Sequence, residues 1–351
     1  MGKEQAMSTV IYVGMDVHLN SIAAVWGRAK EGPRSMTVSP TEEGFKKLVK
    51  EVGEGEVWGV YEASSCGFEA YDVLRGLGWK VSIVAPTHIA KSVQGKKRKT
   101  DLLDAKKLWE VVMSHGELGT DLAEVWIPSE ELQEEREVVR RRLKVSENVC
   151  RVKNGILSLL RMHKIKRPEE MKTAWSQKHV AWLRGLTRGK ELGAAVRLVL
   201  ESYVRELEFV EEEIERLQKA VEEMAEKPRY QAAVKKMTEM EGVGILTALT
   251  FLVELGEMDR FRNRRQVGSY LGLVPTSYES GEANDRKGHI TKMGPARVRK
   301  ILNQAAWHLV RLNSVWRKRY EEIRKRGGAK VAIVAIMRRL GIELWQRAKT
   351  A

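Results

Sequence analysis

The stretch "VIYVGMDVHL" (residues 10–19) is rich in β-branched and aromatic residues, and this composition predicts a β-strand. The next stretch, "SIAAVWGRAKEGPRSMTV" (residues 21–38), predicts further strands around a turn at Gly32-Pro33. Helix and strand patterns then alternate over 41–52, 56–64, 67–78 and 79–86, with a last helix that begins near Thr100. Such alternation predicts a layered α/β domain over residues 1–127.

The following region, residues 128–228, predicts a helical coiled coil. Apolar or aromatic residues recur there at alternating steps of four and three. They are Val196, Leu200, Tyr203, Leu207, Val210, Ile214, Leu217, Val221 and Met224. A looser version of the pattern occupies 129–163, so we expect the two segments to pair as an antiparallel hairpin joined by 164–190. A dimer seam between subunits is the other use of the same pattern.

The third region, residues 229–351, predicts a basic and mostly helical domain. Gly242-Val243-Gly244 stands between two helical patterns and resembles a helix–hairpin–helix turn, whose backbone amides can contact a phosphate. Gly242 and Gly244 are therefore predicted nucleic-acid contacts.

Charge and cysteine content narrow the function further. The 351 residues include 62 Lys and Arg against 47 Asp and Glu, a net charge of +15, which favours a nucleic-acid partner over a membrane. The two cysteines, Cys66 and Cys150, lie outside any metal-ligand spacing and indicate a reducing compartment. No apolar run approaches the roughly 20 residues of a membrane span. We expect a cytoplasmic protein without a membrane partner.

Four carboxylates stand where they can build a metal site. Asp16 lies within the first β-run, Glu62 ends the strand pattern "VWGVYE", and Asp101 and Asp104 share one face of a helix. Mg²⁺ prefers hard oxygen ligands, and two such ions can activate an attacking group and stabilise a leaving oxygen. The basic residues directly before the helical pair are predicted to hold nucleic acid: Lys96, Lys97, Arg98 and Lys99. Taken singly, each acid is more often a solvated turn residue or a helix-start residue.

Taken together, the order of these acids matches a ribonuclease-H-like nuclease layout. The chain resembles the DEDD transposases of the IS110 insertion-sequence family, which are bridge-RNA-guided recombinases. The resemblance rests on "GMDVH" (14–18), "YEASS" (61–65) and "KTDLLDAKKL" (99–108). It extends into the third region through "MEGVGILTALTFLVELGEMDRF" (240–261), "YLGLVP" (270–275) and "SGEANDRKGHITKMGPARVRKIL" (280–302).

The resemblance implies a RuvC-like fold whose DEDD tetrad holds two Mg²⁺ ions, with Mn²⁺ as a substitute. It also implies a serine that attacks a DNA phosphodiester and becomes a covalent phosphoserine. The matching residue is Ser280 in "TSYESGEAN" (276–284), where Gly281 supplies backbone freedom. Family members commonly carry Ser-Ser-Gly at this loop, whereas this chain has Glu279-Ser280-Gly281, and Ser277 remains an alternative. In an ordinary polar loop, a serine at this position only caps a turn.

The same resemblance implies the partners. Donor and target DNA are expected to be chosen by a structured non-coding guide RNA, and subunits to form dimers and tetramers, with contacts along Val196–Met224. Such a protein works in a prokaryotic cytoplasm and joins the nucleoid when bound to DNA. Arg286, Lys287 and Lys292 are interpreted as phosphate contacts. His18 and His289 flank the two predicted sites and are interpreted as ordinary hydrogen-bonding residues.

Two other functions share parts of this pattern. A RuvC-like junction-resolving nuclease needs the tetrad but hydrolyses DNA with water and needs no serine. A non-catalytic nucleic-acid-binding protein needs only the basic surface, with the acids in structural roles.

Overall fold

The computed structural model describes residues 10–29, 31–85, 100–277 and 287–351. The chain divides into two compact units, residues 1–127 and 128–351, and each is described by itself. Unit 1 ends at the residue where the first predicted domain ends. None of the helices within the described ranges is both long enough and apolar enough to span a membrane.

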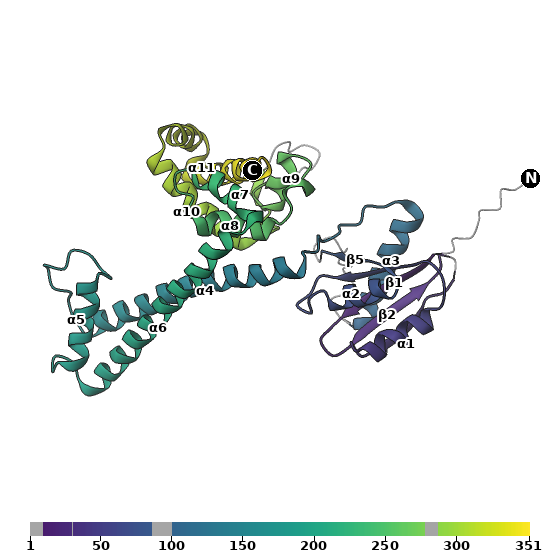
Figure 1. The fold of residues 1–351 in the computed structure, drawn as a ribbon, viewed down its shortest axis with the longest axis horizontal. Coiled ribbons are helices and arrows are strands. Elements are labelled where there is room, and N and C mark those ends of the chain that lie inside the picture. Colours follow the sequence, from purple (N-terminus) through teal and green to yellow (C-terminus); the bar gives the residue numbers. More distant parts are fainter. Residues whose placement is uncertain (1–9, 30, 86–99, 278–286) are drawn as a thin grey trace, which may run out of the picture. The chain divides into compact units, whose positions relative to one another are not determined.

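Unit 1 is built on a mixed five-stranded sheet (Figure 1). Its strands are β1 (Ile11–Val17), β2 (Ile22–Gly27), β3 (Arg34–Val38), β4 (Val57–Glu62) and β5 (Lys80–Val84). The strand order is β3-β2-β1-β4-β5, in which β1, β2 and β3 pair antiparallel while β4 runs parallel to both β1 and β5. The predicted α/β domain is confirmed.

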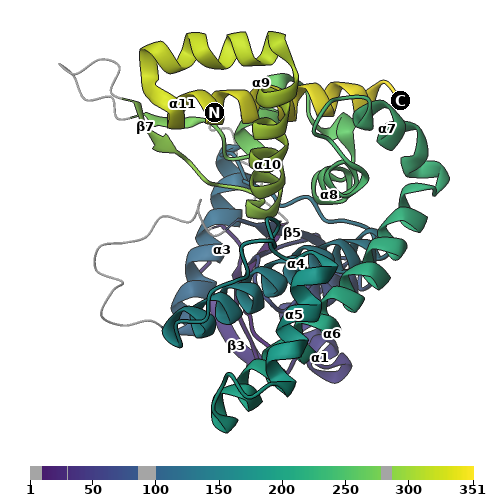
Figure 2. The ribbon, with the colours of Figure 1, turned by 90° about the vertical axis from the view of Figure 1, so that its left-hand side faces the viewer.

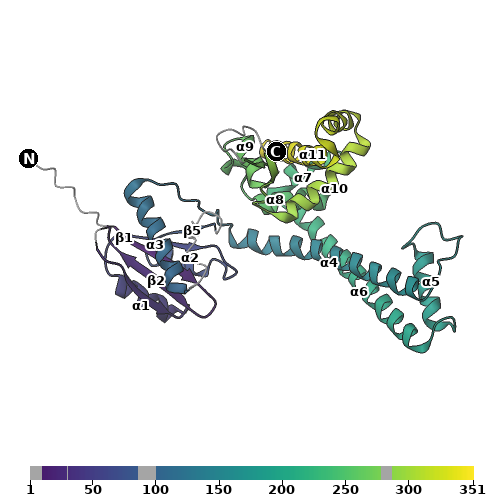
Figure 3. The same cartoon turned by 180° about the vertical axis from the view of Figure 1, so that it is seen from behind.

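Helices cover both faces of this sheet. They are α1 (Glu42–Val52), α2 (Glu69–Gly76) and α3 (Asp101–Leu118). Side chains alternate along β1, so Val13 and Met15 pack with α1 and α2 while Tyr12 packs with α3. α3 contacts β1, β2 and β4 and crosses the sheet, as Figure 3 shows. The alternation along β1 therefore decides which residues lie under α3.

The first part of unit 2 is a long helical hairpin. It consists of α4 (Glu130–Met162), α5 (Gln177–Arg188) and α6 (Ala194–Ala225). α4 and α6 pack antiparallel, and Lys153 Nζ on α4 lies 2.8 Å from Glu211 Oε1 on α6. Seven of the nine predicted heptad residues, among them Leu200 and Leu207, are packed in the core of this hairpin. The seam is thus used within the chain, and a subunit contact along Val196–Met224 stays a prediction.

The second part of unit 2 is mostly helical, as expected, with one small β-hairpin. Its elements are α7 (Pro228–Thr238), α8 (Ile245–Leu255), the 3-10 turn η3 (Met258–Arg260), α9 (Arg264–Tyr270), β6 (Pro275–Ser277), β7 (Lys287–Ile290), α10 (Ala296–Leu312) and α11 (Ser314–Lys349). α11 is kinked at Gly328, where φ is 81°. Both α4 and α6 contact α8, so residues 128–228 and 229–351 pack as one unit. The division at residue 228 stays a prediction.

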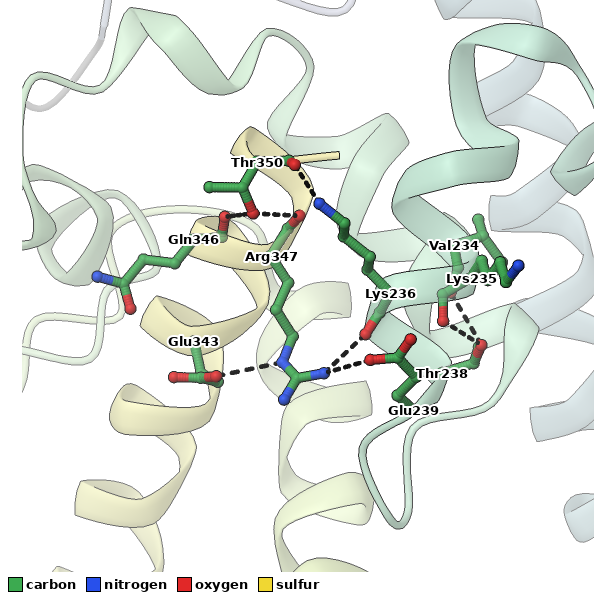
Figure 4. A network of polar contacts seen from close by, with 9 residues as sticks. All are labelled: Val234, Lys235, Lys236, Thr238, Glu239, Glu343, Gln346, Arg347 and Thr350. Atoms are coloured by element: carbon green, nitrogen blue, oxygen red, sulfur yellow. Dashed lines mark hydrogen bonds and ion pairs between the residues drawn. The ribbon is translucent and has the colours of Figure 1, made fainter.

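The end of α11 is fastened to α7 by a polar network (Figure 4). Arg347 Nη1 donates to the carbonyl oxygen of Lys236 at 2.8 Å, and its Nε donates to Glu343 Oε1 at 3.1 Å. Lys236 Nζ donates in return to the carbonyl oxygen of Thr350. The arm of α11 that follows the kink at Gly328 is thus held against α7.

Two buried carboxylates attach α4 to its neighbours. Glu254 at the end of α8 is only 5% exposed and accepts from Arg140 Nε at 2.8 Å and Nη2 at 3.1 Å. Glu135 is 4% exposed and accepts from Lys227 Nζ at 2.8 Å and from the Tyr230 hydroxyl at 2.5 Å. Each carboxylate has cationic or hydroxyl donors in place of water, as a buried charge requires.

Candidate active site

Asp16 and Glu62 share one side of the sheet at the ends of two neighbouring strands. The parallel register pairs Met15 of β1 with Tyr61 of β4, so the next residues along, Asp16 and Glu62, both face α3. Asp16 is the penultimate residue of β1, and Glu62 is the last residue of β4. The sheet therefore brings two acids to the same edge under α3.

A glycine allows α3 to approach this side of the sheet closely. A Cβ at Gly14 would lie 2.0 Å from the backbone nitrogen of Trp109 and 2.2 Å from the carbonyl oxygen of Ala105. Both distances are far inside van der Waals contact, so a larger residue at position 14 would push the helix away. Gly14 stands two residues before Asp16, and α3 is thus seated close to the candidate site.

The first turn of α3 carries the second pair of acids. Asp101 and Asp104 come four residues before Ala105 and Leu108, which are buried against the sheet, so the acids continue the sheet-facing side of the helix. The Thr100 hydroxyl caps the helix by accepting from Leu103 N at 3.4 Å. Negative charge in a first helical turn is also favoured by the helix dipole.

Three side chains meet closely at this edge. One ligand atom from each of Asp16, His18 and Asp101 lies within 4.8 Å of the other two. His18 Nε2 is 3.3 Å from Asp16 Oδ2 and 3.8 Å from Asp101 Oδ1. Glu62 and Asp104 lie outside this close group, and Asp104 Oδ1 accepts from Lys107 Nζ at 2.7 Å.

The electrostatics of the group favour a bound cation. Burial raises the pKa of Asp16 above its ordinary value, contact with His18 lowers it, and the nearby Asp101 and Asp104 raise it again. Carboxylates that raise the pKa of a neighbour are repelling its charged form, and a cation between them removes that repulsion. The oxygen-rich donor set fits a hard divalent ion, with His18 as a nitrogen donor or hydrogen-bonding neighbour.

His18 is the residue whose position the sequence interpretation undervalued. β1 ends at Val17, and His18 N donates to Ser21 O at 2.9 Å in the tight connection to β2. His18 lies two residues after Asp16, and side chains two residues apart on an extended chain point the same way. The two-residue spacing of Asp16 and His18 was therefore the feature of the sequence that could have predicted His18 at the site.

Several predicted nucleic-acid and nucleophile residues fall outside the described residues. They are Lys96, Lys97, Arg98, Lys99, Ser280 and Arg286. Ser277, the last residue of β6, and Lys287, the first residue of β7, are register partners in the β6–β7 hairpin. Lys292 is exposed, with φ at 55°, and its backbone nitrogen donates to Gly272 O at 3.2 Å.

In the predicted helix–hairpin–helix turn, close packing against another helix explains why residue 242 is a glycine. Gly242 has φ at 81°, and a Cβ there would lie 2.7 Å from the Cβ of His308 on α10. Gly244 precedes α8 in open space, with no atom within 4 Å of the corresponding position. Close packing against α10 is sufficient to require Gly242, and phosphate binding by either glycine stays a prediction.

Comparison with known proteins identifies the class. A family model for DEDD-type transposases of the IS110 group, described as "Transposase", matches residues 13–165. A second model, described as "Transposase IS116/IS110/IS902 family", matches residues 234–321. The first match contains all four predicted acids, Asp16, Glu62, Asp101 and Asp104, and the second contains the β6–β7 hairpin.

Individual relatives agree over most of the chain. A Sinorhizobium fredii protein designated y4qE, named as a transposase, is 29% identical over 305 residues, covering 84% of this chain and 71% of the relative. The transposase for insertion sequence element IS1533 of Leptospira borgpetersenii is 27% identical over 305 residues, covering 86% of each chain. The chain belongs to the IS110/IS116 family of transposases. It is therefore a DNA-processing enzyme, and its DEDD domain suggests a divalent metal.

Proposed function

We propose that this transposase cuts and rejoins DNA strands at a RuvC-like metal site that works with a serine nucleophile. The single observation that carries the proposal is that Asp101, at the start of α3, meets Asp16 and His18, which lie more than 80 residues earlier at the end of β1. The sheet order, with three antiparallel strands followed by two parallel ones, supports a RuvC-like fold for unit 1.

The tetrad Asp16, Glu62, Asp101 and Asp104 would hold two Mg²⁺ ions, with Mn²⁺ as a working substitute. When bound, such ions activate an attacking hydroxyl and stabilise the leaving oxygen of a phosphodiester. The chain's own part is to keep the carboxylates aligned. Gly14 and the Thr100 cap fix the start of α3, and Lys107 holds Asp104 at 2.7 Å. Lys96, Lys97, Arg98 and Lys99 would contact the DNA phosphates.

Ser280 is the proposed nucleophile. Its Oγ attacks the phosphorus of a DNA phosphodiester and gives up its proton, the bond from phosphorus to the departing deoxyribose oxygen breaks, and that oxygen takes up a proton. The new phosphoserine ester retains the activated linkage, so a second DNA hydroxyl can attack it, re-form a phosphodiester and release the serine. Arg286, Lys287, Lys292, Gly242 and Gly244 are proposed contacts to the backbone of the DNA.

The proposed function includes a guide RNA and an assembly. A structured non-coding RNA would select donor and target DNA by base pairing, and subunits would act as dimers and tetramers. The net charge of +15 supports a large polyanionic partner, because phosphate neutralisation dominates binding to nucleic acid. The helical hairpin of α4 and α6 remains the proposed place of the subunit contacts, along Val196–Met224.

The experiment looks for a covalent protein–DNA adduct. Purified protein, co-expressed with its flanking non-coding DNA, is mixed with end-labelled donor and target duplexes and Mg²⁺, and the products are separated on a denaturing gel. We expect an adduct with wild type and with Ser277→Ala, and none with Ser280→Ala or Asp101→Ala. Nicked DNA without an adduct, unchanged by Ser280→Ala, would mean hydrolysis by a junction-resolving type of nuclease. Binding with no cleavage under any metal condition would mean a non-catalytic protein.

A further inference from the structure

Unit 2 contains a large basic groove that no residue role described so far explains. It has a volume of about 1130 Å³ and is lined by α9, the β6–β7 hairpin and the two arms of α11 that meet at Gly328. Figure 2 shows these elements gathered at one end of the unit. We name it the α11 groove. Seven cationic side chains line it: Arg264, Arg265, Lys292, Arg319, Lys330, Arg338 and Arg339.

Within the part of the chain that the structure describes, no ion pair neutralises the positive charge of the α11 groove. Over the described ranges, no carboxylate lies within 4 Å of any of the seven cations. Among the described residues of the lining, Glu343 is the one acid, and it is paired with Arg347 at 3.1 Å in the network that fastens α11 to α7 (Figure 4). On the outer side of α11, by contrast, Arg324 is paired with Glu321 at 3.2 Å. The groove therefore gathers several cations that have no carboxylate partner among the described residues, and it is complementary to a polyanion.

The lining of the α11 groove also contains apolar residues and an aromatic ring. Among the apolar residues are Leu273, Ile323, Val331, Val334, Ala335 and Ile342. Trp316 is half-buried, and the Arg319 guanidinium lies 5.4 Å from the centre of its ring. Duplex DNA turns phosphates and sugars outward and keeps its base faces stacked inside. A lining that combines apolar residues with a tryptophan therefore suits a strand with unstacked bases better than a duplex, because bases stack on aromatic side chains.

The cations are spaced for several phosphates of one strand. Lys330 and Arg338 are eight residues apart on one side of α11, which corresponds to about 12 Å along the helix axis. This distance is several times the roughly 3.4 Å between successive phosphates along a B-form strand, so the two cations can contact different phosphates of one strand. Arg319 and Trp316 come from the other arm of α11, beyond the kink at Gly328. The groove thus offers cations and an aromatic ring on facing walls.

We propose that the α11 groove binds a single, unpaired DNA strand. Lys330, Arg338 and Arg339 contact its phosphates, and Trp316 stacks on one of its bases. The inference rests on the proposed function, in which a strand must be held open to be cut and exchanged. The β6–β7 hairpin, which lines the groove through Pro275 and His289, is the element whose connecting segment contains Ser280 in the sequence.

The test measures binding of the full-length protein without divalent metal, so that no cleavage occurs. Fluorescence anisotropy is recorded with a labelled single-stranded DNA, a duplex DNA and a single-stranded RNA of one length and sequence. The groove variant is Lys330→Glu/Arg339→Glu. The matched control is Lys318→Glu/Lys325→Glu, which makes the same change in charge at exposed positions of α11 outside the groove. Circular dichroism checks that both variants are folded.

We expect the groove variant to weaken single-stranded DNA binding roughly tenfold more than the control does. Its slope of log affinity against log salt should fall by about 1.4, at about 0.7 for each lost phosphate contact. Trp316→Ala should weaken binding without changing the slope, and Trp316→Phe should restore it. Equal losses in the two double variants would overturn the proposal. So would a larger groove-specific loss for duplex DNA or for RNA than for single-stranded DNA.

The result of the binding test can be interpreted whether or not Ser280 is the nucleophile. If Ser280 forms no adduct, the binding comparison still stands, because it needs no cleavage. If the groove variant binds single-stranded DNA like the control while Ser280 still forms the adduct, only the groove assignment fails.

Discussion

Asp16 in unit 1 and Glu135 in unit 2 are both removed from water, yet their surroundings act in opposite directions. Burial raises the pKa of Glu135, but hydrogen bonds from Arg229, Lys227 and Tyr230 more than offset it, and its pKa lies below the ordinary value. Burial also raises the pKa of Asp16, and there the contact with His18 does not offset it, while Asp101 and Asp104 raise the pKa further.

The difference separates acids that hold the fold from acids that are available to a ligand. Glu135 and Glu254 have their cations supplied by the chain itself, through Lys227, Arg229 and Arg140. Asp16 faces another carboxylate and an imidazole. A protein that leaves acids facing one another carries an electrostatic cost that a bound cation removes. This contrast is the physical basis for assigning the metal to unit 1, and the following substitutions test it.

The largest expected effect is on catalysis. Asp16→Asn and Asp101→Asn should each reduce strand cleavage at least about a thousandfold, because metal ions contribute several kcal/mol to the transition state. Asp16→Asn should not lower the free energy of unfolding, since it removes a repelling charge, and Asp101→Asn should lower it by no more than about 1 kcal/mol, since the lost interaction with the helix dipole is offset by the same relief. Cleavage is measured on labelled duplexes and stability by chemical denaturation. Asp121→Asn, at an exposed position of unit 1, is the control. If these variants lose stability as well as activity, Asp16 and Asp101 hold the fold as Glu135 and Glu254 do, and the contrast drawn above is wrong.

The next largest effect is expected in unit 2, where a substitution beside a buried carboxylate should reduce stability. Arg140→Met should leave Glu254 buried without its cation and lower the free energy of unfolding by about 3–5 kcal/mol. Arg151→Met, at an exposed position of the same helix, should change it by less than about 0.5 kcal/mol. Urea denaturation of both variants measures the difference. If they unfold alike, Glu254 is not held in the way described.

A backbone substitution joins stability and site geometry in unit 1. Gly14→Ala should cost about 1–3 kcal/mol, since its Cβ meets the backbone of α3, and it should also reduce cleavage by moving Asp101. The control is Gly76→Ala in α2, where the added Cβ meets nothing within 4 Å. That change should be neutral or stabilising by up to about 1 kcal/mol. If Gly14→Ala cleaves DNA as well as the wild type does, the close approach of α3 to the sheet at Gly14 is not needed for cleavage.

The smallest expected effect is at an exposed ion pair. Glu147 on α4 accepts from Lys300 on α10 at 2.7 Å and from Lys144, and these contacts lower its pKa from 4.5 to about 2. A lowered pKa means that the stabilisation is present above about pH 4.5 and is lost as the pH falls toward 2. Because both partners are well exposed, Glu147→Gln should cost less than about 1 kcal/mol at neutral pH. Denaturation curves at neutral and acid pH should converge for wild type and variant, and a constant gap would contradict the ion pair.

The sequence predicted the features that depend on local periodicity. Strand alternation located β1 to β5, heptad spacing located α4 and α6, and three-residue spacing placed Asp101 and Asp104 on one helical face. It did not predict features that depend on how elements meet. The position of His18 beside Asp101 follows from the β1–β2 connection and from the approach of α3 at Gly14. The α11 groove draws residues from 264 to 343, and no local pattern marks them as neighbours. The sharp bend at Gly328 was also missed, although the pair Gly327-Gly328 interrupts the helical pattern and is a turn signal.

The most direct test of the central claim is to count bound Mn²⁺ by electron paramagnetic resonance, since Mn²⁺ reports on sites that take Mg²⁺. The account predicts saturable binding to wild-type protein, which is abolished by Asp16→Asn and by Asp101→Asn and unaffected by Asp121→Asn. Binding that is unchanged in Asp16→Asn and Asp101→Asn, or no saturable binding in wild type with DNA present, would contradict the assignment of the metal to these acids.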